Sequence, residues 1–416
     1  MSREPLDIWL YGTRVATLRD LDERLTLDWT ADALDRWGPG ARLLSAKLTI
    51  GDRAVPPLIK NYLDGLLPEG NARINHAFGA GVPADDTFGL IRAYGRDTHG
   101  AAIFVPTGAN EPTKEGRYQA ITLDELAERL RKADEYSPAD ARTTDESSTL
   151  PGMVPKIVLH RDGDDWFACK EGAPSTWIIK RASSPETDNA DVVDSEVACL
   201  SLARLIGLTT VQAEIIEHGG VRGIAVSRYD RDENDGFVRR HQEDLAQALG
   251  LNTQDPNRKF QWGARTPSLR QGADVLRLDG GNPDQLLRLA TFSLLIGNTD
   301  MHAKNISFIR RPNGQASLSP AYDVAMHLHH RRDNRRSALD INGKHLVSEI
   351  DLDDLAAEGV AWGLPERRAR AVVRRTTHDL AEALSKIDKE DHPGVSHEAW
   401  NMVEERASRA IAAAGG

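Results

Sequence analysis

The chain has 416 residues, of which 40% are hydrophobic and 28% charged, and its formal net charge is −11. This length and composition are typical of a globular protein with two or three folding units, and the negative charge argues against broad, non-specific binding to nucleic acid. We expect no membrane span and no signal peptide, and the two cysteines, too few for a disulfide framework or a thiolate zinc site, fit a reducing, cytoplasmic setting.

The first 110 residues predict a small unit that mixes strands and helices. Residues 3–18 alternate polar and apolar side chains around a turn at Tyr11-Gly12-Thr13, which predicts a hairpin. Residues 43–50 are expected to extend this β layer. Helices are expected over 59–67 and 86–94, and a strand over 101–105.

A short amphipathic helix is predicted from Thr122 to Ala133. Thr122 is a suitable N-cap, and Glu125 follows three residues later, as in a capping box. Residues 134–149 are polar and lack periodicity, so we interpret them as a linker or mobile loop.

A second unit is expected to begin near Leu150. A turn with Gly152 leads into a strand from Lys156, and a later β run, 176–180, ends in Lys180. In a kinase-type nucleotide site, a glycine turn covers the phosphates and a strand lysine reaches them. By itself this pattern fits a β-hairpin with a solvated lysine equally well.

A helix is predicted over 194–205, with Glu196 in its first turn. A kinase needs an acid from such a helix to hold its strand lysine, whereas a plain helix also favours an acid near its positive N-terminus. Two strands, 211–216 and 223–229, then lead to Asp230-Arg231-Asp232, which we interpret as a connector between lobes.

The rest of the chain is predicted to be mainly helical. We expect a compact helix over 241–250, a polar loop over 251–271, and a strand and turn over 338–344. C-terminal helices are expected over 351–358, 365–387 and 397–413.

A buried helix over 283–296 is predicted to end at Gly297-Asn298, and a dense polar loop follows. Within that loop Asp300 and Asn305 are four residues apart, which is the spacing of a kinase catalytic loop. Such a loop uses its aspartate as the base for the attacking hydroxyl and its asparagine as a metal ligand. Asp323, after a short strand, supplies the second hard oxygen ligand that Mg²⁺ requires.

These segments together resemble the HipA family, the bacterial toxin Ser/Thr kinases of type II toxin–antitoxin modules. The resemblance is carried by Gly297 to Asn305, and also by His241 to Asp244, Tyr229 to Arg231, Tyr322 to Val324, Leu67 to Gly70 and Gly95 to Asp97. Two departures are Thr98, where a cysteine is expected, and Met153-Val154-Pro155 within the glycine turn.

The resemblance implies an α+β, two-lobed kinase-like fold with a β-rich N-terminal region and a mainly helical C-terminal lobe. We expect a HipA-type N-terminal subdomain over 1–110, a helix and mobile linker over 111–149, the kinase N-lobe over 150–232 and the C-lobe over 233–416. The nucleotide is expected between the two lobes, near Tyr229.

The resemblance also implies roles for individual residues. Asp300 would be the catalytic base, Asn305 and Asp323 would bind Mg²⁺, and Glu196 would orient Lys180. Autophosphorylation is expected at Thr149, Ser147 or Ser148. The residues expected to contact ATP are Pro151, Gly152, Met153, Val154, Pro155, Lys156, Lys180, Ser227, Arg228, Tyr229, Asp230, His302, Ala303, Lys304, Asn305, Tyr322 and Asp323.

The implied partners are a HipB-like helix-turn-helix antitoxin, operator DNA mainly through that antitoxin, and a protein substrate from the translation machinery, such as an aminoacyl-tRNA synthetase. Two other functions stay open. One is a metal-dependent phosphohydrolase, which would leave Lys180 without a role, and the other is a catalytically silent co-repressor module. The phosphohydrolase would be built from Asp300, His302, Asp323, His327, His329 and His330.

Overall fold

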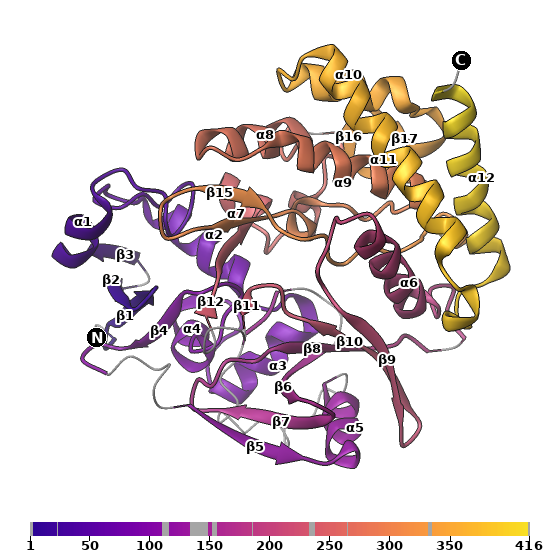
Figure 1. Ribbon diagram of the computed structural model, residues 1–416. Helices are drawn as coiled ribbons and strands as arrows, with labels where there is room; N and C mark the ends of the chain where they lie inside the picture. Colours follow the sequence, from indigo (N-terminus) through magenta and orange to yellow (C-terminus); the bar gives the residue numbers. More distant parts are fainter. Residues whose placement is uncertain are drawn as a thin grey trace.

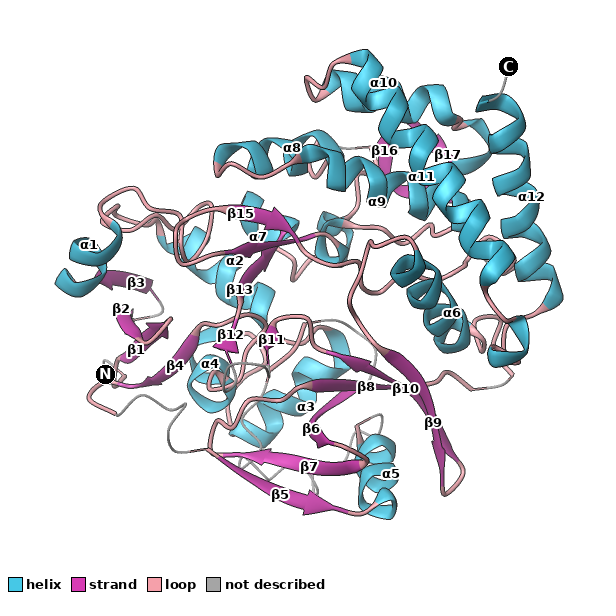
Figure 2. Ribbon diagram, viewed as in Figure 1, coloured by secondary structure: helices cyan, strands magenta, loops and turns pink. Residues whose placement is uncertain are grey.

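A computed structural model describes residues 3–22, 24–109, 116–133, 149–151, 156–184, 186–232, 238–263, 265–331 and 335–414. The first half of the chain mixes strands with short helices, and the longest helices lie in the second half (Figures 1 and 2). This arrangement confirms the predicted α+β architecture. No helix in these ranges is long and apolar enough to cross a membrane.

The N-terminal unit is an antiparallel four-stranded sheet with four helices. The strand order is β3-β2-β1-β4, and Leu6, Ile8 and Leu10 of β1 lie in its core. The predicted hairpin is confirmed and gains β3 as a third strand. The elements are β1 (Leu6–Leu10), β2 (Thr13–Leu21), β3 (Arg24–Trp29), α1 (Ala31–Trp37), α2 (Pro56–Leu66), α3 (Gly70–Ala80), α4 (Thr87–Tyr94) and β4 (Ile103–Pro106).

The second unit is built on a six-stranded antiparallel sheet of order β5-β7-β6-β8-β10-β9. Helix α5 begins after Thr122 and has the predicted capping box with Glu125. The elements are β5 (Arg117–Ile121), α5 (Leu123–Lys132), β6 (Lys156–Asp162), β7 (Asp165–Lys170), β8 (Trp177–Arg181), α6 (Val192–Leu205), β9 (Ala213–His218) and β10 (Val221–Ser227).

Alternation along strand β10 places α5 and α6 on opposite faces of this sheet. Ala225 packs with the α5 cluster, whereas Ile224 and Val226 belong to the core that contains α6. The same alternation applies to β8, where Ile179 packs toward α5. Lys180, the next residue, therefore points to the α6 face.

The C-terminal lobe surrounds α9 (Pro283–Ile296), most of whose side chains are buried. A three-stranded sheet, β13-β14-β15, joins this lobe to the rest of the molecule. Its other elements are β11 (Arg231–Asp232), β12 (Val238–Arg239), β13 (His241–Asp244), α7 (Leu245–Leu249), η2 (Pro256–Lys259), α8 (Leu269–Leu278), η3 (Ala303–Asn305), β14 (Ser307–Arg310), β15 (Ala316–Leu318), β16 (Arg336–Ile341), β17 (Lys344–Leu346), η4 (Val347–Glu349), α10 (Leu352–Ala361), α11 (Glu366–Lys386), η5 (Lys389–Asp391) and α12 (His397–Ala414).

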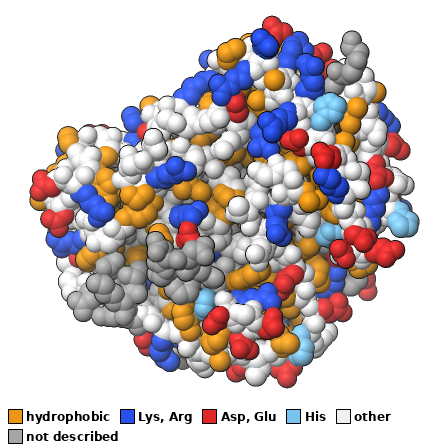
Figure 3. Space-filling view, in the orientation of Figure 1, with side chains coloured by type: hydrophobic (Ala, Val, Ile, Leu, Met, Phe, Trp, Pro, Cys, Tyr) orange, Lys and Arg blue, Asp and Glu red, His pale blue; other side chains and the backbone are white. Residues whose placement is uncertain are grey.

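Basic and acidic side chains are interspersed on the face of the molecule in Figure 3, and the basic ones are frequent over its upper part. Helix α11 contributes to the basic side chains of the lobe through Arg367, Arg368, Arg370, Arg374 and Arg375. The net charge of −11 therefore coexists with local basic surface.

Two predicted elements are wrong, for the same physical reason. Residues 43–50 form no strand, because Ser45 and the Ala46 amide donate to Glu243 at 2.6 and 2.8 Å and the Leu44 carbonyl contacts His241. Residues 241–244 are strand β13 rather than the start of a helix, because they pair with β14. In both places long-range contacts override local preference.

Strand β13 connects the N-terminal unit to the C-terminal lobe through a buried ion network. Glu243 and Arg310 have fully buried side chains and form an ion pair of 2.5 Å. Arg310 also donates to Asp279 at 2.8 Å, and Glu243 accepts from Ser45. A buried charge that loses its partner is strongly destabilising, so this network holds the two regions together.

We predict that Glu243→Gln lowers the free energy of unfolding by about 3–5 kcal/mol, because it leaves Arg310 with one buried carboxylate partner in place of two. The urea-unfolding midpoint, followed by circular dichroism, measures the effect. The matched control is Glu382→Gln, since Glu382 forms an exposed pair with Lys386 and its loss should leave the midpoint unchanged. Equal midpoints for the two variants would contradict the assignment.

Candidate active site

The polar loop of the site is held by the end of helix α9. Gly297 has a left-handed φ of 73°, and its N–H and that of Asn298 bond to carbonyls of the last helical turn. A Cβ at Gly297 would lie 3.1 Å from both Leu328 and Met402, so glycine also suits the packing. The Asn298 side chain then accepts from the Asp300 amide at 3.0 Å, which fixes the start of the loop.

The two ends of the D-x-x-x-x-N spacing lie together. The Asn305 amide nitrogen donates to the Asp300 carbonyl at 2.9 Å, and Asn305 is buried. Since this bond uses the nitrogen, the amide oxygen of Asn305 is the atom suited to a metal.

Lys304 anchors the loop from within. Its ammonium is buried and lies 3.1 Å from Asp244 and 3.7 Å from Glu69 of the N-terminal unit. Burial alone would lower the pKa of Lys304, but these carboxylates raise it, so the side chain stays charged. Lys304 therefore positions the loop from a buried site, and its ammonium is engaged by protein carboxylates.

Tyr322 fastens the segment before Asp323 to the same loop. Its hydroxyl donates to the Lys304 carbonyl at 2.6 Å and lies 2.6 Å from Ser307 Oγ. Its ring packs 5.4 Å from that of Tyr229. Tyr322 thus brings the Asp323 backbone beside the polar loop.

Lys180, Glu196 and Asp323 meet in space although they are far apart in sequence. Lys180 Nζ lies 2.8 and 3.0 Å from the two oxygens of Glu196, and 2.5 Å from Asp323. Helix α6 begins at Val192, so Glu196 stands in its second turn rather than the first, and its partner is the lysine rather than the helix end. The expected pairing of Glu196 with Lys180 is present.

The electrostatics of this trio follow from burial and charge. Burial opposes the charge of Lys180, but Asp323 and Glu196 more than offset it and raise the pKa of the lysine. Desolvation by the surrounding protein likewise opposes ionisation of Asp323, yet Lys180 and Lys156 hold the pKa of its carboxyl below the usual range. Asp323 has a left-handed φ of 53° and a side chain that is 46% exposed, which leaves it accessible to a ligand.

Lys156 lies beside this trio, opposite Lys180 in the β6–β8 pairing. Its ammonium donates to the Pro151 carbonyl at 2.6 Å. Burial and the charge of Lys180 lower the pKa of Lys156 to about 8. Residues 152–155 of the predicted phosphate loop, Gly152, Met153, Val154 and Pro155, lie outside the described residues.

The predicted connector contains a buried network of ion pairs. Arg228 donates to Asp230 at 2.9 and 2.8 Å and to Ser175 at 2.8 Å, while Asp97 pairs with Arg231 at 2.8 Å. Asp230 has a side chain that is only 3% exposed and that is occupied by its ion pair with Arg228. The side chain of Arg228 is equally enclosed, so any contact of this segment with a nucleotide falls to its backbone.

Thr149 does not lie on an open linker. It is fully buried, its amide donates to the Asp97 carbonyl at 3.1 Å, and its hydroxyl donates to the Leu66 carbonyl. Ser147 and Ser148 lie outside the described residues. The hydroxyl of Thr149 is therefore inaccessible in this conformation.

Two aromatic residues beside the loop were not predicted from the sequence. Phe260 stacks on Trp262 with ring centroids 4.2 Å apart and meets His302 edge-on at 5.3 Å. Burial and nearby Lys259 lower the pKa of His302 to about 3, so its imidazole is neutral. The only sequence signal was the pair of aromatic residues within an otherwise polar stretch.

Among the described residues, the histidines proposed for a phosphohydrolase form no metal-ligand group with Asp300. His329 and His330 each bond to Asp191, at 2.8 Å. Among the described residues this trio is the one group with three converging metal-ligand atoms, and it contains neither Asp300 nor Asp323. The described residues therefore form no metal centre at the polar loop of the kind that the phosphohydrolase hypothesis requires.

Comparison with known proteins agrees with the geometry. The HipA-like C-terminal domain model matches residues 148–384, and the HipA N-terminal domain model matches residues 6–105. The chain belongs to the HipA family.

A relative from Shewanella oneidensis, the serine/threonine-protein kinase toxin HipA, is 29% identical over 399 residues, which cover 90% of each chain. The HipA-family chain described here also superimposes on a solved structure from that organism, a complex of HipA, HipB and operator DNA. The TM-score is 0.81 at 24% identity, with 98% of this chain and 97% of the other covered. This likeness confirms the two-lobed, kinase-like fold.

Proposed function

We propose that this HipA-family protein is an ATP-dependent serine/threonine protein kinase that acts as the toxin of a HipA/HipB-like module. The observation that carries the proposal is the meeting of Lys180, Glu196 and Asp323 beside a loop with the Asp300–Asn305 spacing. A lysine–glutamate pair from a strand and a helix, with an aspartate after a strand, is the set that phosphoryl transfer from ATP uses.

Each of these residues has a defined task in this mechanism. Asp300 accepts the proton of the acceptor hydroxyl, and Lys180, held by Glu196, contacts the ATP phosphates. The Asn305 amide oxygen and the Asp323 carboxylate are hard ligands suited to Mg²⁺. When bound, Mg²⁺ neutralises negative charge on the phosphates.

The adenine is proposed to bind along the backbone of Ser227 to Tyr229, where β10 ends. Pro151 to Lys156 would close over the phosphates, since Lys156 lies beside Lys180. His302 and Ala303, with Lys304 beneath them, would form the neighbouring wall. The buried ion pairs of Arg228 and Asp230 keep this connector in place.

The partner proposed for the toxin is a HipB-like antitoxin with a helix-turn-helix fold, which would carry most of the contact with operator DNA. The support for this partner is that the chain is similar to the HipA whose structure was solved in complex with HipB and operator DNA. The net charge of −11 is consistent with leaving operator binding to a partner. The proposed substrate is a translation component such as an aminoacyl-tRNA synthetase, and its phosphorylation would arrest growth and favour persistence.

We predict that Asp300→Asn keeps the fold and ATP binding but lowers phosphoryl transfer at least about 100-fold, because an amide cannot take the acceptor proton. Phosphoproteomics after brief expression, compared between wild type and variant, measures this loss together with growth arrest. The control is Asp274→Asn, since Asp274 is exposed on α8. Persistent phosphorylation and growth arrest in the Asp300 variant would refute the assignment.

A second prediction concerns pH. Lys156, with its pKa lowered to about 8, is protonated below that pH and neutral above it, so its attraction for phosphate fades as pH rises. Lys180 stays charged throughout. If bound phosphate raises the pKa of Lys156 by one unit, the affinity for the nucleotide falls by at most about tenfold as the pH rises through the pKa of this lysine.

Titration with a non-hydrolysable ATP analogue at pH 7.5 and 9 measures the effect. We expect several-fold weaker binding at pH 9 for wild type. Lys156→Met should bind equally at both values and resemble wild type at high pH. A pH dependence that survives in Lys156→Met would assign the titration to another group.

Autophosphorylation is proposed as the control of this activity, at Thr149, Ser147 or Ser148. The Thr149 hydroxyl must leave the Leu66 carbonyl before it can react, and a phosphate carrying roughly −1.5 to −2 charges cannot return to a buried position. Phosphorylation of Thr149 would therefore hold the adjoining phosphate loop away from the site.

We predict that wild type incubated with ATP and Mg²⁺ gains phosphate in the peptide spanning 143–151, as seen by intact mass and peptide mapping. Asp300→Asn should gain none. Hydrogen exchange at the Thr149 amide should rise after modification, because its bond to Asp97 is lost. Equal phosphate in both proteins would point to a contaminating kinase and end the self-inhibition proposal.

A further inference from the structure

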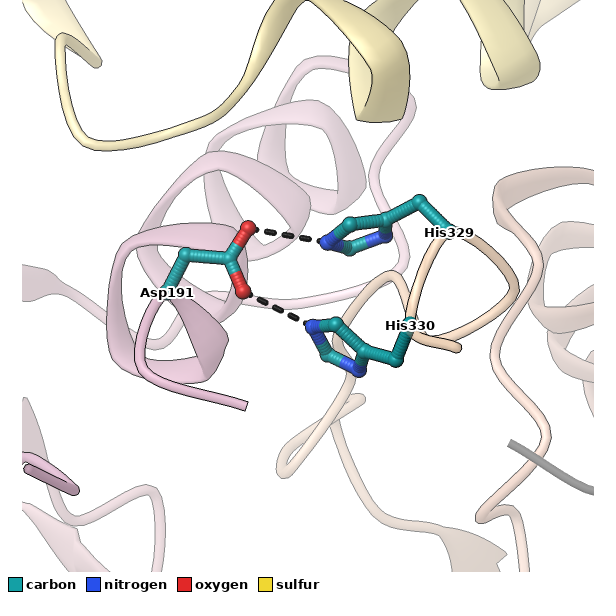
Figure 4. A group of neighbouring side chains, drawn as sticks. All are labelled: Asp191, His329 and His330. Carbon is teal, nitrogen blue, oxygen red and sulfur yellow. Dashed lines mark hydrogen bonds and ion pairs between the residues drawn. The ribbon is translucent and has the colours of Figure 1, made fainter. Parts of the chain in front are cut away.

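Asp191, His329 and His330 form a compact cluster that includes neither Asp300 nor Asp323 (Figure 4). His329 Nε2 and His330 Nε2 each lie 2.8 Å from a different oxygen of Asp191, and the ligand atoms all fall within 4.8 Å of one another. The two imidazole side chains are only 7% and 8% exposed, and Asp191 is 20% exposed.

Asp191 occupies the N-cap position of helix α6 but makes no side-chain cap bond. An aspartate at this position ordinarily accepts from an amide of the first helical turn. Here both oxygens are directed instead to the imidazoles, whose rings pack 4.0 Å apart. The three side chains thus converge on one point, and Asp191 forgoes the N-cap hydrogen bond that it could make to the first turn of α6.

We propose that Asp191, His329 and His330 bind a divalent transition-metal ion of the Zn²⁺ class. Two imidazole nitrogens and one carboxylate oxygen are a ligand set that suits zinc, with a fourth position left to water. Mg²⁺ is a poor match because it prefers an all-oxygen shell. With bonds of about 2.0–2.2 Å to each ligand, the present oxygen–nitrogen contacts would open by roughly half an ångström.

The cluster lies where two segments of the active site meet. Asp191 stands five residues before Glu196, and His329 stands six residues after Asp323. Between them, Ser195 Oγ accepts from the Met326 amide at 2.6 Å. A metal here would fasten α6 to the segment after Asp323 and so stabilise the positions of Glu196 and Asp323. This consequence rests on the proposed kinase function, whereas metal binding itself does not.

The experiment uses the full chain, stripped with a chelator and kept in excess Mg²⁺ without nucleotide, so that oxygen-only sites are occupied. Equilibrium dialysis against Zn²⁺ gives the stoichiometry, and Co²⁺ substitution gives a visible absorption band that reports the ligand geometry. We expect one Zn²⁺ per wild-type chain and its loss in the double variant His329→Gln/His330→Gln. The matched control is His378→Gln/His397→Gln, which removes two exposed histidines and should retain the ion.

A measurement on wild type alone guards against misfolding of the variants. Zn²⁺ should slow amide hydrogen exchange in peptides spanning 188–197 and 324–331, and leave those within α11 unchanged. The proposal is overturned if wild type binds no stoichiometric Zn²⁺, if the double variant binds as much as wild type, or if exchange at the cluster is unaffected. In those cases the histidines simply donate to a shared carboxylate. If the zinc-loaded wild type showed no phosphoryl transfer from ATP, the proposed kinase function would be refuted and the metal site would stand.

Discussion

Four consecutive polar residues, His241 to Asp244, lie inside the protein, and the arrangement of its parts depends on satisfying them. A buried polar group without a partner destabilises a fold by several kcal/mol, and an unpaired charge does so more strongly. Each of the four finds partners on a different segment. His241 contacts the Leu44 carbonyl, Gln242 contacts Tyr229 and Asp230, Glu243 pairs with Arg310, and Asp244 pairs with Lys304.

This constraint makes the N-terminal unit part of the candidate active site. Glu69 reaches the buried Lys304 from the N-terminal unit, and the carbonyl of Gly65 accepts from the same ammonium at 3.3 Å. The loop from Asp300 to Asn305 is thereby supported from beneath by residues more than 230 positions away in the chain. Activity of the C-terminal lobe by itself would require another way to satisfy Lys304.

The connector between the sheet and the helical lobe is rigid for a similar reason. Asp97 pairs with Arg228, Arg231 and Arg239, and Asp230 pairs with the first two of these. Burial of Asp97 is more than offset by the surrounding positive charge, which lowers its pKa to about 2. Arg228 of this connector also donates to Ser175 Oγ and to the Thr98 carbonyl, each at 2.8 Å. The position of Lys180 relative to Asp323 is therefore set by an ionic network outside the site, in addition to the lysine's own ion pairs.

The sequence by itself was sufficient to predict the elements with strong local signals. Helix α9 has the bounds expected from its apolar pattern and its terminal glycine, and α5 has the predicted capping box, because both signals act within a few residues. The pairing of Lys180 with Glu196 also followed from motif order. The tertiary structure decided the rest: β13 took the place of the first four residues of a predicted helix, Asp230 and Thr149 became buried, and Asp191 met His329 and His330. Those outcomes depend on partners distant in the chain, and local periodicity carries no information about which distant group will neutralise a buried charge.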